Sequence, residues 1–146
     1  MVEKTNGGFL ITKIKQIQGR VFEKMLAESG ISEFNGSQGR ILFVLWERDG
    51  IPITELSEKT GLAKTTLTSM LDRLERSGHI VRAFDAADRR AVRIRLTDSA
   101  RGLREKYEEV SAKMNRIFYK GFSDDEVIAF EENLEKILNN LTERER

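Results

Sequence analysis

Short hydroxyls and cations lie on one side of a predicted helix between Gly61 and Gly78. These residues are Lys64, Thr65, Thr66, Thr68, Ser69, Arg73 and Arg76. The opposite side is apolar and carries Leu67, Met70, Leu71 and Leu74 at offsets of three and four. Side chains at that spacing share one face, so this helix has a core side and a free side. The hydroxyls and cations of the free side can hydrogen-bond to base edges and phosphates in a major groove.

The elements around this helix make it the second member of a helix-turn-helix. A short helix precedes it and begins with the apolar Ile53 and the capping residue Thr54. Gly61 ends the first helix and Gly78 ends the second, because glycine tolerates the positive φ of a helix end. Two short helices joined by a tight glycine turn, with the second polar and basic outside, form this motif.

A β-hairpin is predicted directly after the second helix. Residues 80–84 and 92–96 alternate on both sides of a polar turn, which is typical of a hairpin with one buried face. From His79 to Arg104 the chain has seven arginines and three acids, a net charge of +4. These charges could simply keep a solvated hairpin soluble, but their one-sided sign favours a basic wing. A helix-turn-helix followed by a basic hairpin is a winged helix.

Three short motifs in this stretch can be compared with known families. They are L-D-R-L-E-x-x-G from Leu71 to Gly78, D-R-R-A from Asp88 to Ala91, and L-T at Leu96 and Thr97. In combination they resemble the multiple-antibiotic-resistance regulator (MarR) family of bacterial repressors. Upstream, Asn35-x-x-Gln38 resembles the start of that family's second helix. Ala63 departs from the family, in which many members open the recognition helix with serine. Alanine cannot accept hydrogen bonds from the first-turn amides, so this departure puts the N-cap of the helix in doubt.

The resemblance implies a role for the tip of the wing. Arg90 would enter the minor groove of double-stranded DNA, and Asp88 would hold its guanidinium in place. Arg89 would contact phosphate. The resemblance also implies a homodimer formed by helices from both termini, and release of the DNA when a small aromatic or phenolic anion binds.

Such an effector would bind in a cleft between the reading domain and the dimer helices. The aromatic and thioether side chains that could line it are Phe22, Met25, Phe43, Trp46 and Tyr107, with Arg20 or Lys13 as the anion's partner. The alternative interpretation is that these apolar residues are ordinary core, since a stripe at helical spacing usually packs.

Amphipathic helices are predicted on both sides of the winged region. Residues 8–29 carry one apolar stripe, and residues 36–48, apolar nearly all round, should form the buried centre of the domain. Residues 99–120 and a helix capped by Ser123 with Glu126 carry heptad-spaced stripes. These stripes could pack within one monomer. They exceed what a small winged domain needs, however, so we expect a homodimer.

Composition excludes several other classes of protein. The chain has 146 residues, no cysteine and a single histidine, His79. Disulfides, thiolate sites and thiol redox sensing are therefore excluded, and we expect neither a metal nor a cofactor. No run of about 18 apolar residues and no signal peptide is present, so we expect a cytoplasmic protein without membrane contact. No nucleophile, phosphate loop or acid–base pair indicates an enzyme.

The expected fold is mostly α (α+β), a winged helix-turn-helix at residues 36–97 within a single domain of residues 1–146. Dimerisation helices are expected at residues 8–29 and 99–141. The expected function is a sequence-specific, DNA-binding transcriptional repressor acting on a pseudo-palindromic operator. The alternatives are a winged-helix module for protein–protein assembly and a nonspecific DNA binder. The small polar side chains of the reading helix favour specific reading, because a protein-binding helix should expose Leu, Tyr or Trp.

Overall fold

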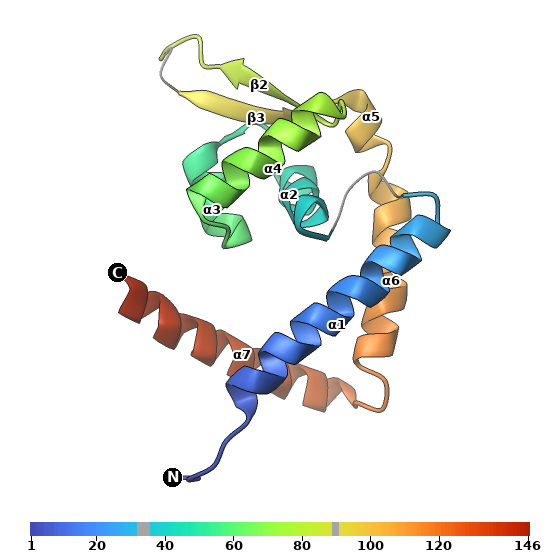
Figure 1. Ribbon diagram of the computed structural model, residues 1–146, viewed down its shortest axis with the longest axis vertical. Helices are drawn as coiled ribbons and strands as arrows, with labels where there is room; N and C mark the ends of the chain where they lie inside the picture. The colour runs from blue at the N-terminus through green and yellow to red at the C-terminus, as the bar shows by residue number, and fades with distance from the viewer. Residues whose placement is uncertain (32–35, 89–90) are drawn as a thin grey trace. The chain divides into compact units, whose positions relative to one another are not determined.

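The structure is a computed structural model that describes residues 1–31, 36–88 and 91–146. The elements in chain order are α1 (Gly7–Glu28), α2 (Gly36–Glu47), β1 (Ile51–Pro52), α3 (Ile53–Thr60), α4 (Lys64–Arg76), β2 (Ile80–Phe84), β3 (Val92–Leu96), α5 (Asp98–Arg101), α6 (Arg104–Phe118) and α7 (Asp124–Glu145). Figure 1 shows these helices with the small sheet, and the order confirms the expected mostly α winged-helix fold. Within the described residues, no helix is both long and apolar enough to cross a membrane.

The chain divides into two compact units, Met1–Ser111 and Ala112–Arg146, and the boundary falls within α6. The first unit holds α1 to α5, the sheet and the first part of α6. The second unit holds the end of α6 and the whole of α7.

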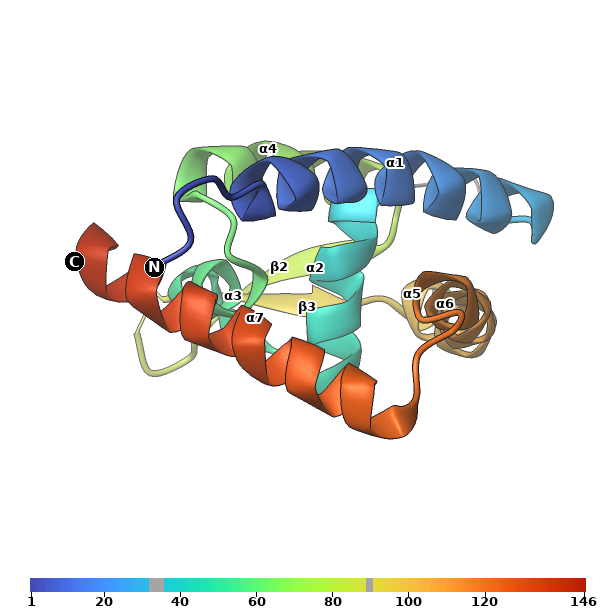
Figure 2. The same ribbon diagram turned by 90° about the horizontal axis from the view of Figure 1, so that it is seen from below.

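Helix α2 lies at the centre of the first unit's core. Its side chains Ile41, Leu42 and Leu45 are fully buried, and the helix packs against β3, which it crosses in the view of Figure 2. The expectation of burial nearly all round is wrong at Phe43, which is 47% exposed. Phe43 lies about 100° further round the helix than Leu42, on the side that no neighbouring element of this unit covers.

The sheet is antiparallel, with β3 between β1 and β2. Ile80 pairs with Leu96 and Phe84 pairs with Val92, which confirms the predicted hairpin. The expected buried face holds at Ile80, Ile94 and Leu96 but is wrong at Phe84, which is 72% exposed near the end of the hairpin, beyond the core. Strand β1 has only two residues, too few to show a periodicity. It exists because Ile51 pairs with Ile94 across the sheet.

The turns of the helix-turn-helix form as predicted, but the start of the first helix differs. Gly61 and Gly78 adopt φ of 73° and 80°, so both helices end in left-handed turns that favour glycine. Thr54 does not cap α3. The helix begins one residue earlier, at Ile53, with Pro52 in the capping position. Proline suits a helix start because its φ is fixed and no amide hydrogen is left unpaired.

The single helix predicted over residues 99–120 is interrupted. The hydroxyl of Thr97 accepts a hydrogen bond from Ala100 N–H at 3.2 Å and caps the short helix α5, which begins at Asp98. The helix then breaks at Gly102 before α6 begins at Arg104. Glycine is the poorest helix former in this stretch, which explains the break.

The second unit is a helical corner closed by aromatic side chains. Ser123 and Glu126 form the predicted capping box at the start of α7. Tyr119 lies at the centre of an aromatic group, with ring centroids 4.8 Å from Phe118, 5.7 Å from Phe122 and 6.2 Å from Phe130. This cluster fixes the turn between α6 and α7.

Candidate nucleic-acid interface

Helix α4 separates core and free side chains as the sequence predicts. Leu67 and Leu71 are fully buried and Leu74 is nearly so. The predicted reading residues are all exposed: Lys64, Thr65, Thr66, Thr68, Ser69 and Arg73. They are therefore brought together on one solvent-facing surface.

Two local features decide which hydrogen-bonding groups of α4 remain available to a binding partner. Thr68 donates its hydroxyl hydrogen to the carbonyl of Lys64 at 2.8 Å, so only its acceptor lone pairs face outward. Ala63 stands at the N-cap and provides no side-chain hydrogen bond, as its type predicts. The first-turn N–H groups of α4 are thus not capped by a side chain, and their dipoles favour a nearby anion.

Arg82 links the recognition helix to the wing. From β2 its guanidinium donates to Asp72 at 2.7 Å and to Glu75 at 3.0 Å, both on α4. The two acids of this helix are thereby neutralised beside its exposed cations. Sequence periodicity does not reveal these contacts, since Arg82 lies ten and seven positions away from its partners. The only signal is the pair of acids at i and i+3 on a helix that is otherwise basic outside.

The turn of the wing is held by its own first residue. Asp85 accepts from Ala87 N–H at 2.9 Å and from Arg93 Nε at 3.4 Å. The Ala87 N–H bond, with a further contribution from Arg93, holds the pKa of the Asp85 carboxyl below its usual value. Asp88 is exposed and accepts from Ala91 N–H at 3.0 Å through its backbone carbonyl. Arg89 and Arg90 lie outside the described residues, so the roles expected for them stay predictions.

His79 is buried at the junction between α4 and β2. Its Nδ1 lies 2.7 Å from the hydroxyl of Ser77, and its carbonyl accepts from Thr97 N–H at 3.0 Å. These contacts make it a structural residue of the junction. In the part of the chain that the structure describes, no group of three or more His, Cys, Asp or Glu could hold a metal ion.

Comparisons with known proteins agree on one family. The model of the MarR family matches residues 34–92. The HTH-type transcriptional regulator TtmR of Methylorubrum extorquens is 42% identical over 90 residues, which cover 62% of this chain and 45% of TtmR. The chain belongs to the MarR family. Members of this family are transcription regulators and not enzymes.

Solved structures of DNA complexes share the MarR fold of this chain. Reduced AbfR bound to DNA superposes with a TM-score of 0.72 at 28% identity, covering 91% of this chain and 88% of AbfR. A mutant MarR from E. coli complexed with operator DNA gives a TM-score of 0.81 at 26% identity, covering 90% and 92%. Because the alignment with TtmR spans less than half of that regulator's length, an activity of the whole protein is argued below as a proposal.

The residues expected to line a MarR-type effector cleft are only partly brought together. Tyr107 packs edge-on against Phe22 with ring centroids 5.5 Å apart, and its ring centroid lies 5.0 Å from that of Trp46. Trp46 is buried and donates its indole N–H to the carbonyl of Ala100 at 3.0 Å. These are packing contacts of the core, as the alternative interpretation holds.

The remaining members of that set lie in different environments. Met25 is partly buried against the core, whereas Phe43, Arg20 and Lys13 are exposed. Burial raises the pKa of the Tyr107 hydroxyl to about 12, so this phenol is neutral at physiological pH. An effector site at these residues stays a prediction.

Proposed function

We propose that this chain is a homodimeric, sequence-specific transcriptional repressor that acts on DNA in the cytoplasm. Helix α4 would enter the major groove and the β2–β3 wing would reach the adjacent minor groove. The observation that carries the proposal is the exposed face of α4, where four small hydroxyl side chains lie among cations. Small hydroxyls can approach base edges closely, while lysine and arginine reach phosphates.

Three features of the first unit support binding to a polyanion. Arg82 neutralises both acids of α4, so the remaining charges on its exposed face are positive. The N-terminus of α4 lacks a side-chain cap and therefore favours a phosphate nearby. At the base of the wing turn, Asp85 accepts hydrogen bonds from Ala87 N–H and from Arg93. AbfR and E. coli MarR, which share this fold, were both solved in complex with DNA.

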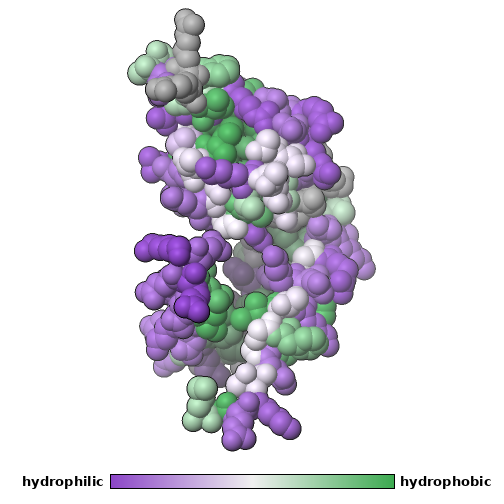
Figure 3. Space-filling model, turned by 60° about the vertical axis from the view of Figure 1, so that its left-hand side comes forward, coloured by the Kyte–Doolittle hydropathy of each residue, from purple (hydrophilic) through white to green (hydrophobic). Residues whose placement is uncertain are grey.

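Surface apolar residues support the homodimer. Helix α1 leaves six large apolar side chains exposed, Phe9, Leu10, Ile11, Ile14, Ile17 and Val21, and the spacing of Leu10, Ile14, Ile17 and Val21 puts those four on one face. Helix α7 separately exposes Ile128, Ile137, Leu138 and Leu141. Figure 3 shows apolar side chains reaching the surface beside hydrophilic ones. Contiguous exposed apolar surface on a protein marks an interaction site, and a second copy of the chain would bury it.

The proposal is tested by selecting binding sites from random DNA duplexes and measuring affinity across a salt series. We expect a pseudo-palindromic site with half-sites about ten base pairs apart, one turn of DNA, because a two-fold axis relates the two reading helices. Thr66→Ala should change the preferred sequence, since Thr66 would read a base. Lys64→Ala should weaken binding to all sites alike and reduce the salt slope by about one.

Other outcomes would identify a different function. If the protein binds DNA without a preferred sequence, and Thr66→Ala does not alter that lack of preference, the protein is a nonspecific DNA binder. No salt-dependent affinity for any duplex would leave protein–protein assembly as the function of the winged helix.

A further inference from the structure

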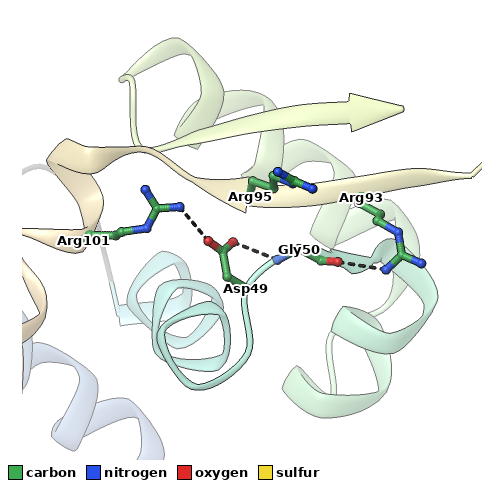
Figure 4. A pocket seen from close by; sticks show the side chains of 5 residues that line it. All are labelled: Asp49, Gly50, Arg93, Arg95 and Arg101. Atoms are coloured by element: carbon green, nitrogen blue, oxygen red, sulfur yellow. Dashed lines mark hydrogen bonds and ion pairs between the residues drawn. The ribbon is translucent and has the colours of Figure 1, made fainter. Parts of the chain in front are cut away.

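Three arginines surround an open pocket on the outer face of the sheet. Arg93 and Arg95 come from β3 and Arg101 from α5, while Asp49 and Gly50 complete the lining (Figure 4). The cavity volume is about 340 Å³, near the lower end of the roughly 300–1,000 Å³ typical of ligand pockets. The size suits a small ligand, and the lining suits an anion.

The Asp49 carboxylate in this lining accepts hydrogen bonds from neighbouring protein groups. Asp49 Oδ1 accepts from the backbone N–H of Gly50 at 2.8 Å and of Leu96 at 2.9 Å. Its Oδ2 accepts from Arg101 at 2.8 Å. Three donors therefore offset its charge. Among the lining residues alone, three arginines less one aspartate give a formal charge of +2, while Asp85 and Asp98 pair with Arg93 and Arg101 from outside the lining.

Two of the guanidiniums are held in place by protein contacts. Arg93 donates to the carbonyl of Gly50 at 2.9 Å and to Asp85, and Arg101 donates to Asp98 at 2.8 Å as well as to Asp49. A guanidinium has five N–H donors, so each retains donors for a ligand. Fixed guanidinium groups lose little freedom when they bind an anion.

Arg95 supplies the uncommitted cation of the pocket. It is exposed, and its guanidinium makes no hydrogen bond or ion pair with any other residue in the described ranges. The planar guanidinium fork matches the oxygens of phosphate, which it can bind through two parallel hydrogen bonds. Arg95 would therefore close the site around a ligand that the other two arginines position.

The pocket lies on the sheet face opposite the recognition helix. Ile94 and Leu96 alternate with the two strand arginines and are buried in the same core as Leu71 of α4. The arginines therefore point away from that core, and from the helix proposed to read DNA. We propose that this pocket binds a small free oxyanion of the phosphate class, held by Arg93, Arg95 and Arg101.

Inorganic phosphate tests the site in the full-length protein. Phosphate would replace chloride at constant ionic strength while the backbone amide signals of Gly50 and of residue 95 are followed by NMR. We expect saturable shifts, with the apparent Kd roughly tenfold higher in Arg95→Gln because a charge-assisted bidentate contact is lost. Arg95→Lys should give an intermediate Kd, since it keeps the charge but loses the fork. Arg73→Gln, which removes an exposed arginine of α4, is the matched control and should titrate like the unsubstituted chain.

The controls separate a site from general effects of phosphate. Phosphate stabilises most proteins through exclusion from their surface, an effect that does not saturate. Shifts that fail to saturate, or that are identical in Arg95→Gln, would overturn the proposal. It would also be overturned if Arg95→Gln weakened DNA binding while leaving the phosphate titration unchanged, because Arg95 would then contact the DNA backbone.

Discussion

Arg82 lies between the two parts of the proposed DNA-binding surface. It belongs to the wing strand β2, yet both of its ion pairs are with the recognition helix α4. Its side chain is 25% exposed, whereas Asp72 and Glu75 are 50% and 43% exposed. One residue therefore neutralises acids that would repel phosphate and also ties the orientation of the helix to that of the wing.

Replacing Arg82 with glutamine should affect both stability and DNA binding. We expect the free energy of unfolding to fall by about 0.5–2 kcal/mol, the sum of two partly exposed ion pairs. DNA affinity should fall because Asp72 and Glu75 are left unpaired beside the phosphates. Urea unfolding and DNA titration at fixed salt measure the two effects.

A triple variant separates the two roles of Arg82. Adding Asp72→Asn and Glu75→Gln to Arg82→Gln should restore much of the DNA affinity, because the repelling charges are gone. The lost stability should not return. Arg76→Gln, on the same helix, is the control and should change stability by less than about 0.5 kcal/mol. Full DNA affinity in Arg82→Gln alone would contradict the electrostatic role.

Both tyrosines should lose their hydroxyl protons only at unusually high pH, for different reasons. Burial raises the pKa of Tyr107 to about 12, and the hydrogen bond that Tyr119 donates to Glu131 raises the pKa of Tyr119 to about 12. An unfolded tyrosine titrates near a pKa of about 10. The folded state thus holds these protons more tightly. The resulting stability is complete below pH 10 or so and is lost as the pH rises through about 12.

Ultraviolet titration of tyrosinate absorbance tests this prediction. The folded protein should show no tyrosine ionising near pH 10, and Tyr119→Phe should leave a single late transition from Tyr107. Glu131→Gln should lower the pKa of Tyr119 and leave that of Tyr107 unchanged. A normal transition in the folded protein would contradict the environments described for both rings.

At the scale of elements, helix α2 approaches α6 through a glycine. A Cβ placed on Gly39 would lie 2.8 Å from Oη and 2.9 Å from Cε2 of Tyr107. Tyr107 has little room to move, because its ring packs against Phe22 and Trp46. The absence of a side chain at residue 39 thus lets Tyr107 cover the central helix.

Gly39→Ala should destabilise the protein by about 1–2 kcal/mol, because the added methyl overpacks the contact with Tyr107. The matched control is Gly19→Ala in α1, where a Cβ would meet nothing within 4 Å. That change should stabilise its helix by about 0.5–1 kcal/mol. Urea unfolding at matched protein concentration measures both. Equal effects of the two substitutions would show that helix propensity alone determines the change in the free energy of unfolding.

For the whole molecule, the apolar faces of α1 and α7 are the features that one chain does not explain. Ile14 and Ile137 are each 43% exposed, so a charge at either position costs a single chain little. In a homodimer the same charge would be buried without a partner, which is strongly unfavourable.

Ile14→Glu and Ile137→Glu should therefore each convert the protein from a dimer to a monomer. Lys15→Glu, an exposed position beside Ile14, is the control for added negative charge and should remain dimeric. Sedimentation equilibrium measures the mass, and DNA titration should show much weaker binding by the monomeric variants. A dimer that persists in both variants would contradict the assignment of these faces to the interface.

The sequence by itself determined the elements whose signals are local. The stripe at Leu67, Leu71 and Leu74, the helix-ending glycines and the alternation in residues 80–84 each reflect a repeat or a backbone preference contained within a few residues. Such signals do not depend on the rest of the chain, so the winged helix and the exposed face of α4 follow from them. The capping box of α7 is predictable for the same reason.

Tertiary structure decided whatever depends on partners distant in sequence. Strand β1 forms because Ile94 lies beside Ile51, and Arg82 meets Asp72 only because the wing folds back over α4. The arginine pocket unites residues 49–50 with residues 93–101, which have no common periodicity. Phe43 is exposed because the neighbours of α2 cover only part of its circumference. A sequence pattern states which side chains share a face, but packing determines what that face meets.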